Sequence, residues 1–257
     1  MITKPKGCYD VTGDVSKKYQ RICEVVSEYA KIYNYKYIRT PLFESTELFK
    51  RGVGDTTDIV QKETYDFTDR GGRDFTLRPE GTAGVVRNFI EDKLYGNQSS
   101  VVKEFYIGTM YRYERPGLGR NREFTQFGVE CLGSDDEMID AEVISLSYNI
   151  LKELGLDVTV KINNLGSTED RENYKKALVE YLTPHINNLC EDCQNRIKTN
   201  PLRILDCKVD DQSEILKNAP SILDYHSKES NDRFNKILSY LDYLDVDYEI
   251  DNTLVRG

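Results

Sequence analysis

The chain has 257 residues, of which 39% are hydrophobic and 31% are charged, a composition that excludes a disordered or fibrous protein. No segment approaches the roughly 18 consecutive apolar residues of a membrane helix, and the N-terminus lacks the apolar segment of a signal peptide, so we expect a cytoplasmic protein. The net charge of −9 argues against non-specific nucleic-acid binding, although a local basic patch would still permit an RNA substrate.

Apolar residues at helical spacing predict a first helix over residues 14–34. An extended segment follows at 35–44, where Pro41 has no amide proton for sheet pairing and fits either an edge strand or a strand at a subunit boundary. Residues 64–78 alternate in period two around the turn DRGGRD and predict a hairpin. The apolar stripe of the helix at residues 14–34 consists of Tyr19, Ile22, Val26, Tyr29 and Tyr33.

The middle of the chain predicts a helix followed by two long strands. Thr82 suits the N-cap of a helix that runs to about Leu94, which places the end of the preceding strand at Glu80. Residues 103–114 and 124–133 alternate cleanly and are separated by the polar loop RPGLGRNRE. We therefore expect a second, longer hairpin here.

The last part of the chain is predominantly helical in pattern. Ser134 and Glu137 occupy the positions of a capping box at the start of a long helix. Residues 157–163 alternate as a strand, residues 168–243 are charged and helical, and residues 246–257 return to a strand. The apolar stripe of the long helix consists of Ile139, Val143, Leu146, Ile150 and Leu154.

The order of these elements predicts an α+β fold, with a largely antiparallel sheet flanked by helices. The chain has no internal repeat and no low-complexity linker. We expect a core domain at residues 1–165, a mainly helical insertion at 166–245, and a return strand into the core at 246–257.

The two long strands share one polar face. Successive side chains on a strand point to opposite faces, so Arg112 and Glu114 lie on the same face as Gln126 and Glu130. We expect this face to lie outside the core, because unpaired buried charges cost several kcal/mol. The polar face also holds Met110, Phe124, Gly128 and Leu132, and the opposite face, expected to be core, holds Phe105, Ile107, Tyr111, Tyr113, Phe127, Val129 and Cys131.

A solvated surface is the simplest interpretation of such a face, but three features favour a ligand site. Gly128 in mid-strand indicates a close approach, and Phe124 is a large aromatic residue on a polar face. The loop supplies guanidinium groups suited to phosphate oxygens. Together these features suggest a nucleotide and a ligand with an amino group. The loop arginines are Arg115, Arg120 and Arg122.

The same residues carry a resemblance to the class II aminoacyl-tRNA synthetases, in the histidyl-tRNA synthetase form. Motif 2 of that family resembles YRYERPGLGRNREFTQFGVECLG, and its histidine-binding segment resembles TLRPEGTAGVVR. Its motif 1 region is similar to YKYIRTPLFESTELFKRGVGDTTDIVQKETYDFTDRGG, and later portions match NPLRILDCK and LVRG. The resemblance covers essentially the whole chain in order and places motifs 1 and 2 in residues 1–165.

The resemblance implies a histidine–tRNA ligase that binds histidine, ATP with Mg²⁺, and tRNA(His), and that forms a homodimer through the region of Pro41. Histidine would be activated as the adenylate, with Arg112 and Arg256 as catalytic residues beside the α-phosphate. The implied histidine ligands are Glu80, Thr82, Arg112, Gln126, Glu130 and Arg256, and the implied ATP ligands are Arg112, Glu114, Arg120, Arg122 and Phe124.

Individual roles follow from the same resemblance. Glu80, Thr82 and Gln126 would hold the α-amino group of histidine, and Glu130 would bind the imidazole. Glu114 and Phe124 would lie at the adenine, with the ring of Phe124 stacked on it. Arg120 and Arg122 would reach the outer phosphates or the tRNA acceptor end.

The chain departs from the family pattern at its end. Family members continue past the position of Gly257 with a tyrosine-containing stretch, motif 3 and an anticodon-binding domain, so we expect that this chain alone does not charge tRNA. The alternative is the non-catalytic, histidine-sensing regulatory subunit of ATP phosphoribosyltransferase, a paralogue that also lacks the anticodon domain. The arginines on the ATP side argue against that alternative. A third interpretation, a dimerising or RNA-binding module, conflicts with the acidic balance.

Six cysteines are spread unevenly along the chain, and we expect no disulfide framework. Cys190 and Cys193 form a C-x-x-C pair and Cys207 follows, but a zinc site needs a fourth ligand. His185 and His226, the only histidines, lie outside the usual zinc-finger spacings. The pattern favours plain thiols, and we assign no metal ligand.

Overall fold

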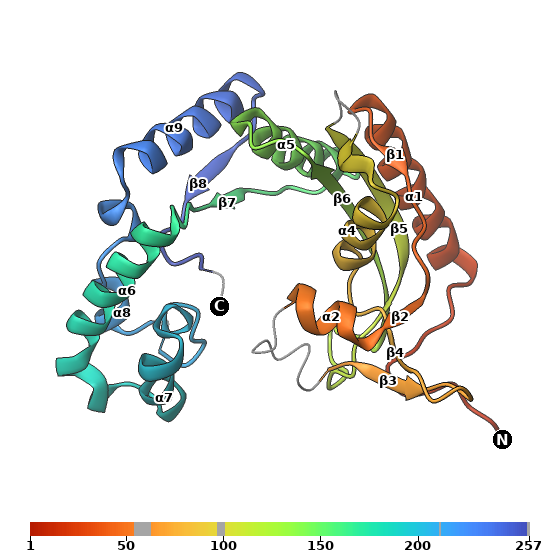
Figure 1. Cartoon of the computed structure of the whole chain (residues 1–257), viewed down its shortest axis with the longest axis horizontal. Coiled ribbons are helices and arrows are strands. Elements are labelled where there is room, and N and C mark those ends of the chain that lie inside the picture. Colours follow the sequence, from red (N-terminus) through yellow and green to blue (C-terminus); the bar gives the residue numbers. More distant parts are fainter. Residues whose placement is uncertain (54–62, 97–100, 211, 256–257) are drawn as a thin grey trace. The chain divides into compact units, whose positions relative to one another are not determined.

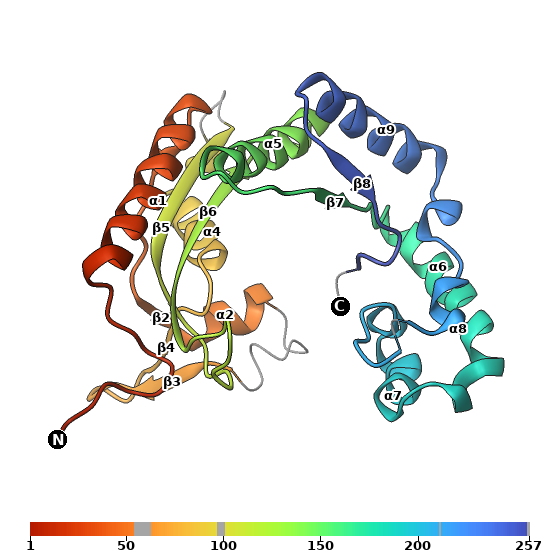
Figure 2. The same cartoon turned by 180° about the vertical axis from the view of Figure 1, so that it is seen from behind.

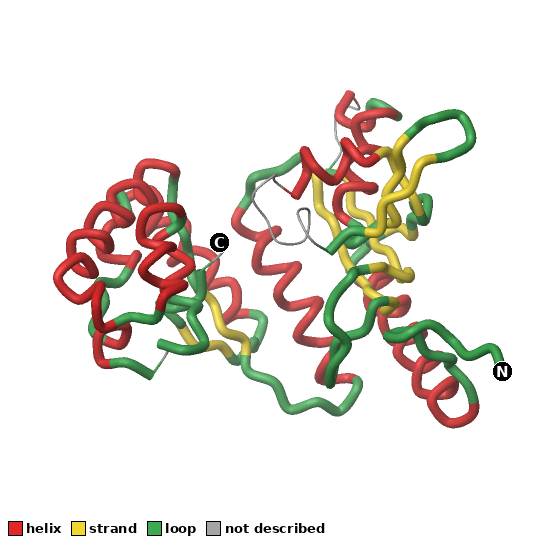
Figure 3. The backbone as a smooth tube through the Cα atoms, turned by 90° about the horizontal axis from the view of Figure 1, so that it is seen from below, coloured by secondary structure: helices red, strands yellow, loops and turns green. Residues whose placement is uncertain are grey.

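The structure is a computed structural model, and it describes residues 1–53, 63–96, 101–210 and 212–255. The chain forms two compact units: unit 1 is Met1–Asp135 with Asn149–Leu156, and unit 2 is Asp136–Tyr148 with Asp157–Gly257. The long strands belong to the part of the chain that carries the N-terminus (Figure 3). The boundaries expected after residues 165 and 245 stay predictions, since compactness divides the chain at other positions.

The main sheet of unit 1 has the strand order β1-β5-β6. Strands β5 (Val102–Tyr111) and β6 (Glu123–Leu132) pair antiparallel over their whole length, and β1 (Lys36–Tyr37) pairs parallel with β5. Helices α1 (Gly13–Ile32) and α4 (Thr82–Glu91) lie on opposite sides of this sheet (Figures 1 and 2). The second hairpin predicted from period-two alternation is confirmed.

A smaller sheet in unit 1 has the order β2-β4-β3. Its strands β2 (Phe43–Ser45), β4 (Asp74–Leu77) and β3 (Tyr65–Thr68) are all antiparallel, which confirms the first predicted hairpin. Helix α2 (Thr46–Val53) follows β2 directly. Pro41 lies between β1 and β2, outside both strands, as its missing amide proton requires.

Helix α1 buries a stripe that differs from the predicted one. Val25, Val26 and Ala30 are fully buried, whereas Ile22, which was expected on the buried stripe, is 43% exposed. Ala30 was not part of the predicted stripe because its side chain is small, yet it is fully buried. The buried face is therefore rotated from the tyrosine-rich stripe.

Helix α4 begins differently from the sequence expectation. Thr82 is its first residue rather than its N-cap, and Gly81 occupies the cap position without a side-chain hydrogen bond. The carboxylate of Glu80 accepts hydrogen bonds from the amides of Thr82 and Ala83 and supplies the missing cap. This arrangement leaves the Thr82 hydroxyl available for another contact. The helix ends at Glu91 and is followed by a 3₁₀ turn, η1 (Leu94–Gly96).

The expectation that the polar face of β5–β6 lies outside the core was wrong in part. Met110 is completely buried and Tyr106 is 7% exposed, and both pack with Val85 of α4 on this face. Helix α4 covers one stretch of the strands, and the charged residues lie where its N-terminus begins. On the opposite face Phe105 is buried as expected.

Unit 2 contains a short parallel strand pair, β7 (Val160–Ile162) and β8 (Tyr248–Ile250), which confirms both predicted strands. Helix α9 (Lys228–Tyr243) and the first part of α5 (Glu137–Glu153) share a core with them. Helix α5 starts at Glu137 rather than after Ser134, because the Asp136 carboxylate accepts the amide of Met138. The core consists of Ala141, Tyr148, Ile162, Phe234, Leu241 and Val246.

The remainder of unit 2 is helical, as predicted, and forms its own core around the fully buried Tyr174, Leu178 and Leu182. No helix among the described residues combines the length and the apolar character that a membrane span requires. The helical segments are α6 (Thr168–Leu182), η2 (Thr183–Asn188), α7 (Glu191–Thr199), η3 (Pro201–Ile204), α8 (Glu214–Lys217) and η4 (Ile222–Tyr225).

Candidate functional site

The β5–β6 hairpin and the N-terminus of α4 bring together the predicted site residues of unit 1. The strand register places Gly108 opposite Gln126 and Glu104 opposite Glu130. Glu80 lies in the turn just before α4. Residues of three sequence segments thus meet on one face of the sheet.

The carboxylates of Glu80 and Glu130 flank Thr82. Glu80 accepts the Thr82 amide, and the Thr82 hydroxyl donates to an Oε1 atom of Glu130 at 2.7 Å. Burial, the largest effect, raises the pKa of Glu130, and the neighbouring charge of Glu80 raises it further, while the Thr82 hydrogen bond acts in the opposite direction. Glu80 and Glu130 form an acidic wall in which each carboxylate retains unused acceptor capacity.

Tyr106 is a site residue that the sequence interpretation missed. Its ring lies between Gly81 and Gly128, because a Cβ atom at either glycine would overlap the ring or its hydroxyl. Burial first, and then the charge of Glu130, raises the pKa of Tyr106 to about 12, so the hydroxyl stays protonated. The pairing of Tyr106 with Gly128 across the strands was the available signal, once the register was known.

Gly128 was therefore interpreted wrongly as a mark of ligand approach. The group that approaches its backbone is the side chain of Tyr106, from the partner strand. A similar relation holds at Gly108, whose missing Cβ makes room for the guanidinium of Arg78. Arg78 is buried and donates to the carbonyl oxygens of Thr109 and Thr40. Both glycines serve internal packing.

Gln126 has a buried side-chain oxygen with no hydrogen-bond partner among the described residues. Buried polar atoms are nearly always paired in native proteins, and an exception needs an explanation. Gln126 lies two residues from both Phe124 and Gly128 on the polar face. A ligand that donates a hydrogen bond at this position would satisfy its oxygen.

Arg112 connects the acidic wall to the other end of the hairpin. Its Nε atom donates to the carbonyl oxygen of Pro79 at 2.9 Å, next to Glu80. Its guanidinium lies 5.1 Å from the centroid of the Phe124 ring, and Nη1 is 3.9 Å from a carboxylate oxygen of Glu114. The backbone and ring contacts hold Arg112 in place while its Nη atoms keep donors for a further anion.

The loop after β5 holds the remaining cations. Arg120 is largely exposed and lies 3.7 Å from the second carboxylate oxygen of Glu114. Arg122 donates to the backbone oxygen of Glu114 and stacks on Tyr113 at 4.1 Å, so part of its donor set serves the loop itself. Phe124 packs partly against the Tyr106 core. The loop is an arginine-rich edge beside the acidic wall.

Arg256, expected beside the α-phosphate, lies outside the described residues. Glu80, Thr82, Gln126, Glu130 and Phe124 gather on or beside the face described above, with Arg112 over the Phe124 ring, whereas Glu114, Arg120 and Arg122 belong to the loop at its edge. A separate group of potential metal ligands in unit 2 consists of Cys190, Cys193, Cys207 and Asp210.

Comparisons with known proteins identify the family of the chain. The family model described as "Histidyl-tRNA synthetase" matches residues 7–257. The histidine–tRNA ligase of Anoxybacillus flavithermus is 53% identical over 254 residues, which are 98% of this chain and 60% of that protein. The histidine–tRNA ligase of Halothermothrix orenii is 53% identical over 257 residues, 100% of this chain and 61% of that protein.

Two solved structures resemble the chain. Apo histidyl-tRNA synthetase of S. aureus has a TM-score of 0.77 and 40% identity, and the match covers 100% of this chain and 58% of that one. A protein of Bacillus halodurans C described as an ATP phosphoribosyltransferase regulatory subunit/histidyl-tRNA synthetase has a TM-score of 0.67 at 23% identity, covering 99% and 69%, and shows the fold alone. The chain spans about 60% of the length of the curated relatives that it matches.

Proposed function

Because the chain belongs to the histidyl-tRNA synthetase family, we propose that its β5–β6 face binds histidine and ATP and activates histidine as the adenylate for transfer to tRNA(His). The observation that carries the proposal is the junction at Arg112. This residue is held against the Pro79 carbonyl beside the acidic wall and also borders the arginine-rich loop. An amino acid and a nucleotide would meet there.

The acidic wall suits the cationic and N–H groups of histidine. The carboxylate of Glu80 uses some of its acceptor sites in capping α4 and keeps others for an α-ammonium group. The unpaired oxygen of Gln126 offers a further acceptor. Glu130 would accept an N–H of the imidazole, with Thr82 fixing the carboxylate through its hydroxyl.

The arginine-rich loop suits ATP. Arg120 and Arg122 would contact the outer phosphates or the tRNA acceptor end, and Glu114 and Phe124 would lie at the adenine. Mg²⁺ that arrives with ATP keeps phosphate oxygens and water as ligands, so the protein needs to supply few groups, and Glu114 is the carboxylate at this end. When bound, the ion would neutralise phosphate charge.

The chemistry needs alignment more than proton transfer. A carboxylate oxygen of histidine forms a bond to the α-phosphorus of ATP, the bond from that phosphorus to the bridging oxygen breaks, and pyrophosphate leaves. The attacking carboxylate is already ionised, so no general base is required. Arg112, together with Arg256, would stabilise the charge that develops on the α-phosphate oxygens.

The homodimer proposed for the family is supported by exposed apolar residues around Pro41. Tyr37, Leu42 and Phe43 are each about half exposed or more. Clustered apolar exposure of this kind marks interaction surfaces. Light scattering would find a dimer, and Leu42→Glu would shift it towards a monomer, whereas Leu156→Glu, at an equally exposed apolar residue elsewhere, would not.

The proposal is tested by histidine-dependent ATP–pyrophosphate exchange, measured on this chain and, if the reading frame extends past Gly257, on the longer protein. Arg112→Ala should lower exchange by about 10²–10³-fold, the usual cost of removing one preorganised charge-stabilising donor. Arg70→Ala, at an exposed arginine in the β3–β4 turn, is the matched control and should leave exchange unchanged. Histidine binding without exchange in the complete protein would favour the regulatory-subunit alternative instead.

A further inference from the structure

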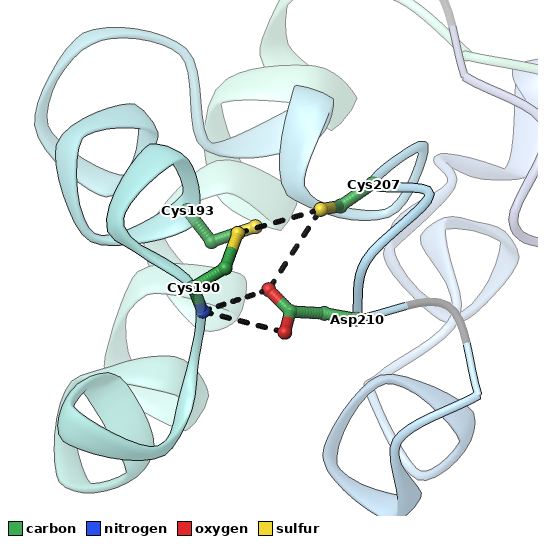
Figure 4. Close-up of side chains that lie close together, drawn as sticks. All are labelled: Cys190, Cys193, Cys207 and Asp210. Atoms are coloured by element: carbon green, nitrogen blue, oxygen red, sulfur yellow. Dashed lines mark hydrogen bonds between the residues drawn. The ribbon is translucent and has the colours of Figure 1, made fainter.

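Three cysteines and one aspartate meet in the helical part of unit 2, far from the β5–β6 face in sequence. Cys190 precedes α7, Cys193 lies in the first turn of that helix, and Cys207 and Asp210 belong to the turns after η3. Figure 4 shows their side chains pointing towards one another. One potential ligand atom from each residue lies within 4.8 Å of all the others.

We propose that Cys190, Cys193, Cys207 and Asp210 form a structural zinc site. The sequence interpretation favoured plain thiols over zinc because the three cysteines lacked a fourth ligand. The fold supplies that ligand as a carboxylate. It also reveals two pairs with equal spacing, Cys190-x-x-Cys193 and Cys207-x-x-Asp210, the paired arrangement typical of zinc sites.

The distances match a tetrahedral ion. With Zn–S bonds of about 2.3 Å, two thiolates on one zinc lie about 3.8 Å apart. The sulfur atoms of Cys190 and Cys207 are 3.6 Å apart, and the sulfur of Cys207 is 3.7 Å from Oδ2 of Asp210. Small rotations of the side chains would bring all four ligand atoms to one centre.

The orientation of Asp210 fits a metal ligand whose carboxylate is fixed by further hydrogen bonds. The backbone amide of Cys190 donates to both carboxylate oxygens, at 3.0 and 3.3 Å. Metal-binding carboxylates are typically fixed by such additional hydrogen bonds. Among the described residues, the donors to Asp210 are this amide and a cysteine thiol rather than a basic side chain. A divalent cation would supply the missing positive charge.

Burial makes the site a closed one. Cys193 is fully buried, Cys207 is 3% exposed and Asp210 is 8% exposed, whereas Cys190 is half-buried at the edge of the site. Cys193 and Cys207 belong to the hydrophobic core of the helical segment, together with Leu189 and Leu202. Four protein ligands, with no position left for water, are the mark of structural rather than catalytic zinc. The ion would join the start of α7 to the turn that follows η3.

Two other interpretations are less consistent with the geometry. A disulfide would use two of the cysteines and leave the third thiol and the carboxylate without a purpose, and all three cysteines are unbridged. Plain buried thiols would not need a carboxylate aimed at them, because a thiol is a weak hydrogen-bond donor and compensates little for burying a charge. His226, the nearer histidine in sequence to Asp210, contacts the backbone of Asn164 instead.

The first test is the metal content of the complete purified chain, prepared without chelators and measured by inductively coupled plasma mass spectrometry. We expect about one zinc per chain. The matched control replaces the three cysteines outside the cluster (Cys8→Ser, Cys23→Ser and Cys131→Ser) and should keep the zinc. Cys207→Ser should lose it, and Asp210→Ala should weaken zinc binding more than tenfold in a chelator competition, at least the effect of losing a supporting contact.

The second test needs no variant and so does not depend on a variant that folds. Cobalt substituted into the unaltered chain should show the thiolate charge-transfer bands and the intense visible bands of tetrahedral Co²⁺. Titration with a mercurial thiol reagent should release zinc in step with three thiols. Any of three results would overturn the proposal. These are a folded chain that takes up neither metal, a Cys190–Cys207 disulfide in the purified protein, and equal zinc content in Cys207→Ser and in the control.

Discussion

Two carboxylates that contact the first turns of helices show how differently the two units use the same group. Glu130 in unit 1 receives one side-chain hydrogen bond, from Thr82, and burial raises its pKa. Asp170, in the first turn of α6 in unit 2, is 3% exposed, yet its pKa is held far below the usual range. The contrast arises from the donors around each group rather than from burial.

Asp170 is fully enclosed by donors. The hydroxyl of Ser230 has the largest effect on its pKa, and the backbone amides of Ser167 and Ser227 also donate to the carboxylate. Ser167 in turn caps α6 and completes a capping box with Asp170. A carboxylate used in this way serves the fold. A half-buried carboxylate that keeps spare acceptor sites, like Glu130, is available to a ligand.

The largest effect is expected from Asp170→Ala, which would leave several buried donors unpaired. A lowered folded-state pKa contributes stability above the unfolded-state value of about 3.9, and this contribution is lost as the pH falls towards the folded-state pKa. The variant should therefore melt several degrees lower than the unaltered chain at pH 7, with a difference that shrinks below about pH 4. Circular dichroism melts would measure it, with the exposed Glu169→Ala as control.

Gly128→Ala tests whether the Tyr106 ring packs directly against Gly128. The added methyl group would collide with the Tyr106 ring, at an overpacking cost of about 1–3 kcal/mol. Urea unfolding should show this loss. Gly96→Ala, where a Cβ would meet nothing, should be nearly neutral. Equal stability of both variants would contradict the placement of Tyr106 between Gly81 and Gly128.

Glu130→Gln should separate stability from binding. We expect histidine binding to weaken by about 10–100-fold, the range for one hydrogen bond to a charged group. Since burial raises the pKa of Glu130, the unfolded chain releases this proton first as the pH rises, and stability is lost between about pH 4.3 and the folded-state pKa. The variant should melt higher than the unaltered chain near pH 7 and equally below pH 4.

Calorimetry of histidine binding and melts at both pH values would check these outcomes. Glu123→Gln, on the opposite face of β6, is the control and should leave histidine binding unchanged. A Glu130→Gln variant that binds histidine normally would mean that Glu130 is only a packing residue, like Asp170.

The smallest effect is expected from Arg122→Ala. Its stacking on Tyr113 and its hydrogen bond to the backbone of Glu114 are half-buried contacts, and the loss should be about 0.5–1 kcal/mol in urea unfolding. ATP–pyrophosphate exchange should fall much less than in Arg112→Ala. A loss as large as that of Arg112→Ala would place Arg122 directly on the reacting phosphate.

Local patterns predicted most of the elements correctly. Both hairpins, the helical region after residue 168 and the two strands of unit 2 were recognised from their periodicity, because period two and period 3.6 are properties of neighbouring residues. Helix starts were less predictable. Thr82 and Ser134 are good capping residues by type, yet Glu80 and Asp136 supply the caps, since the choice depends on how the chain enters the helix.

The sequence predicted which residues belong to the candidate site but not which groups surround them. Arg112, Gln126 and Glu130 were assigned to one face by alternation alone. The register places Gln126 and Glu130 there, and the Arg112 guanidinium lies over the ring of Phe124 on the same face. Tyr106 and Asp210 were missed, because each acquires its meaning from a partner that only the folded chain brings near. Gly128 was misread for the same reason.

The sequence by itself determined the elements, the family and the residues with chemical potential, since these depend on residue type and short-range spacing. Tertiary structure decided what each group can do. Thr82 and Glu130 are 48 residues apart, and Asp170 and Ser230 are 60 apart. The pKa and the free acceptor sites of a carboxylate depend on the donors within hydrogen-bond reach, and for both groups the chain supplies those donors only after it has folded.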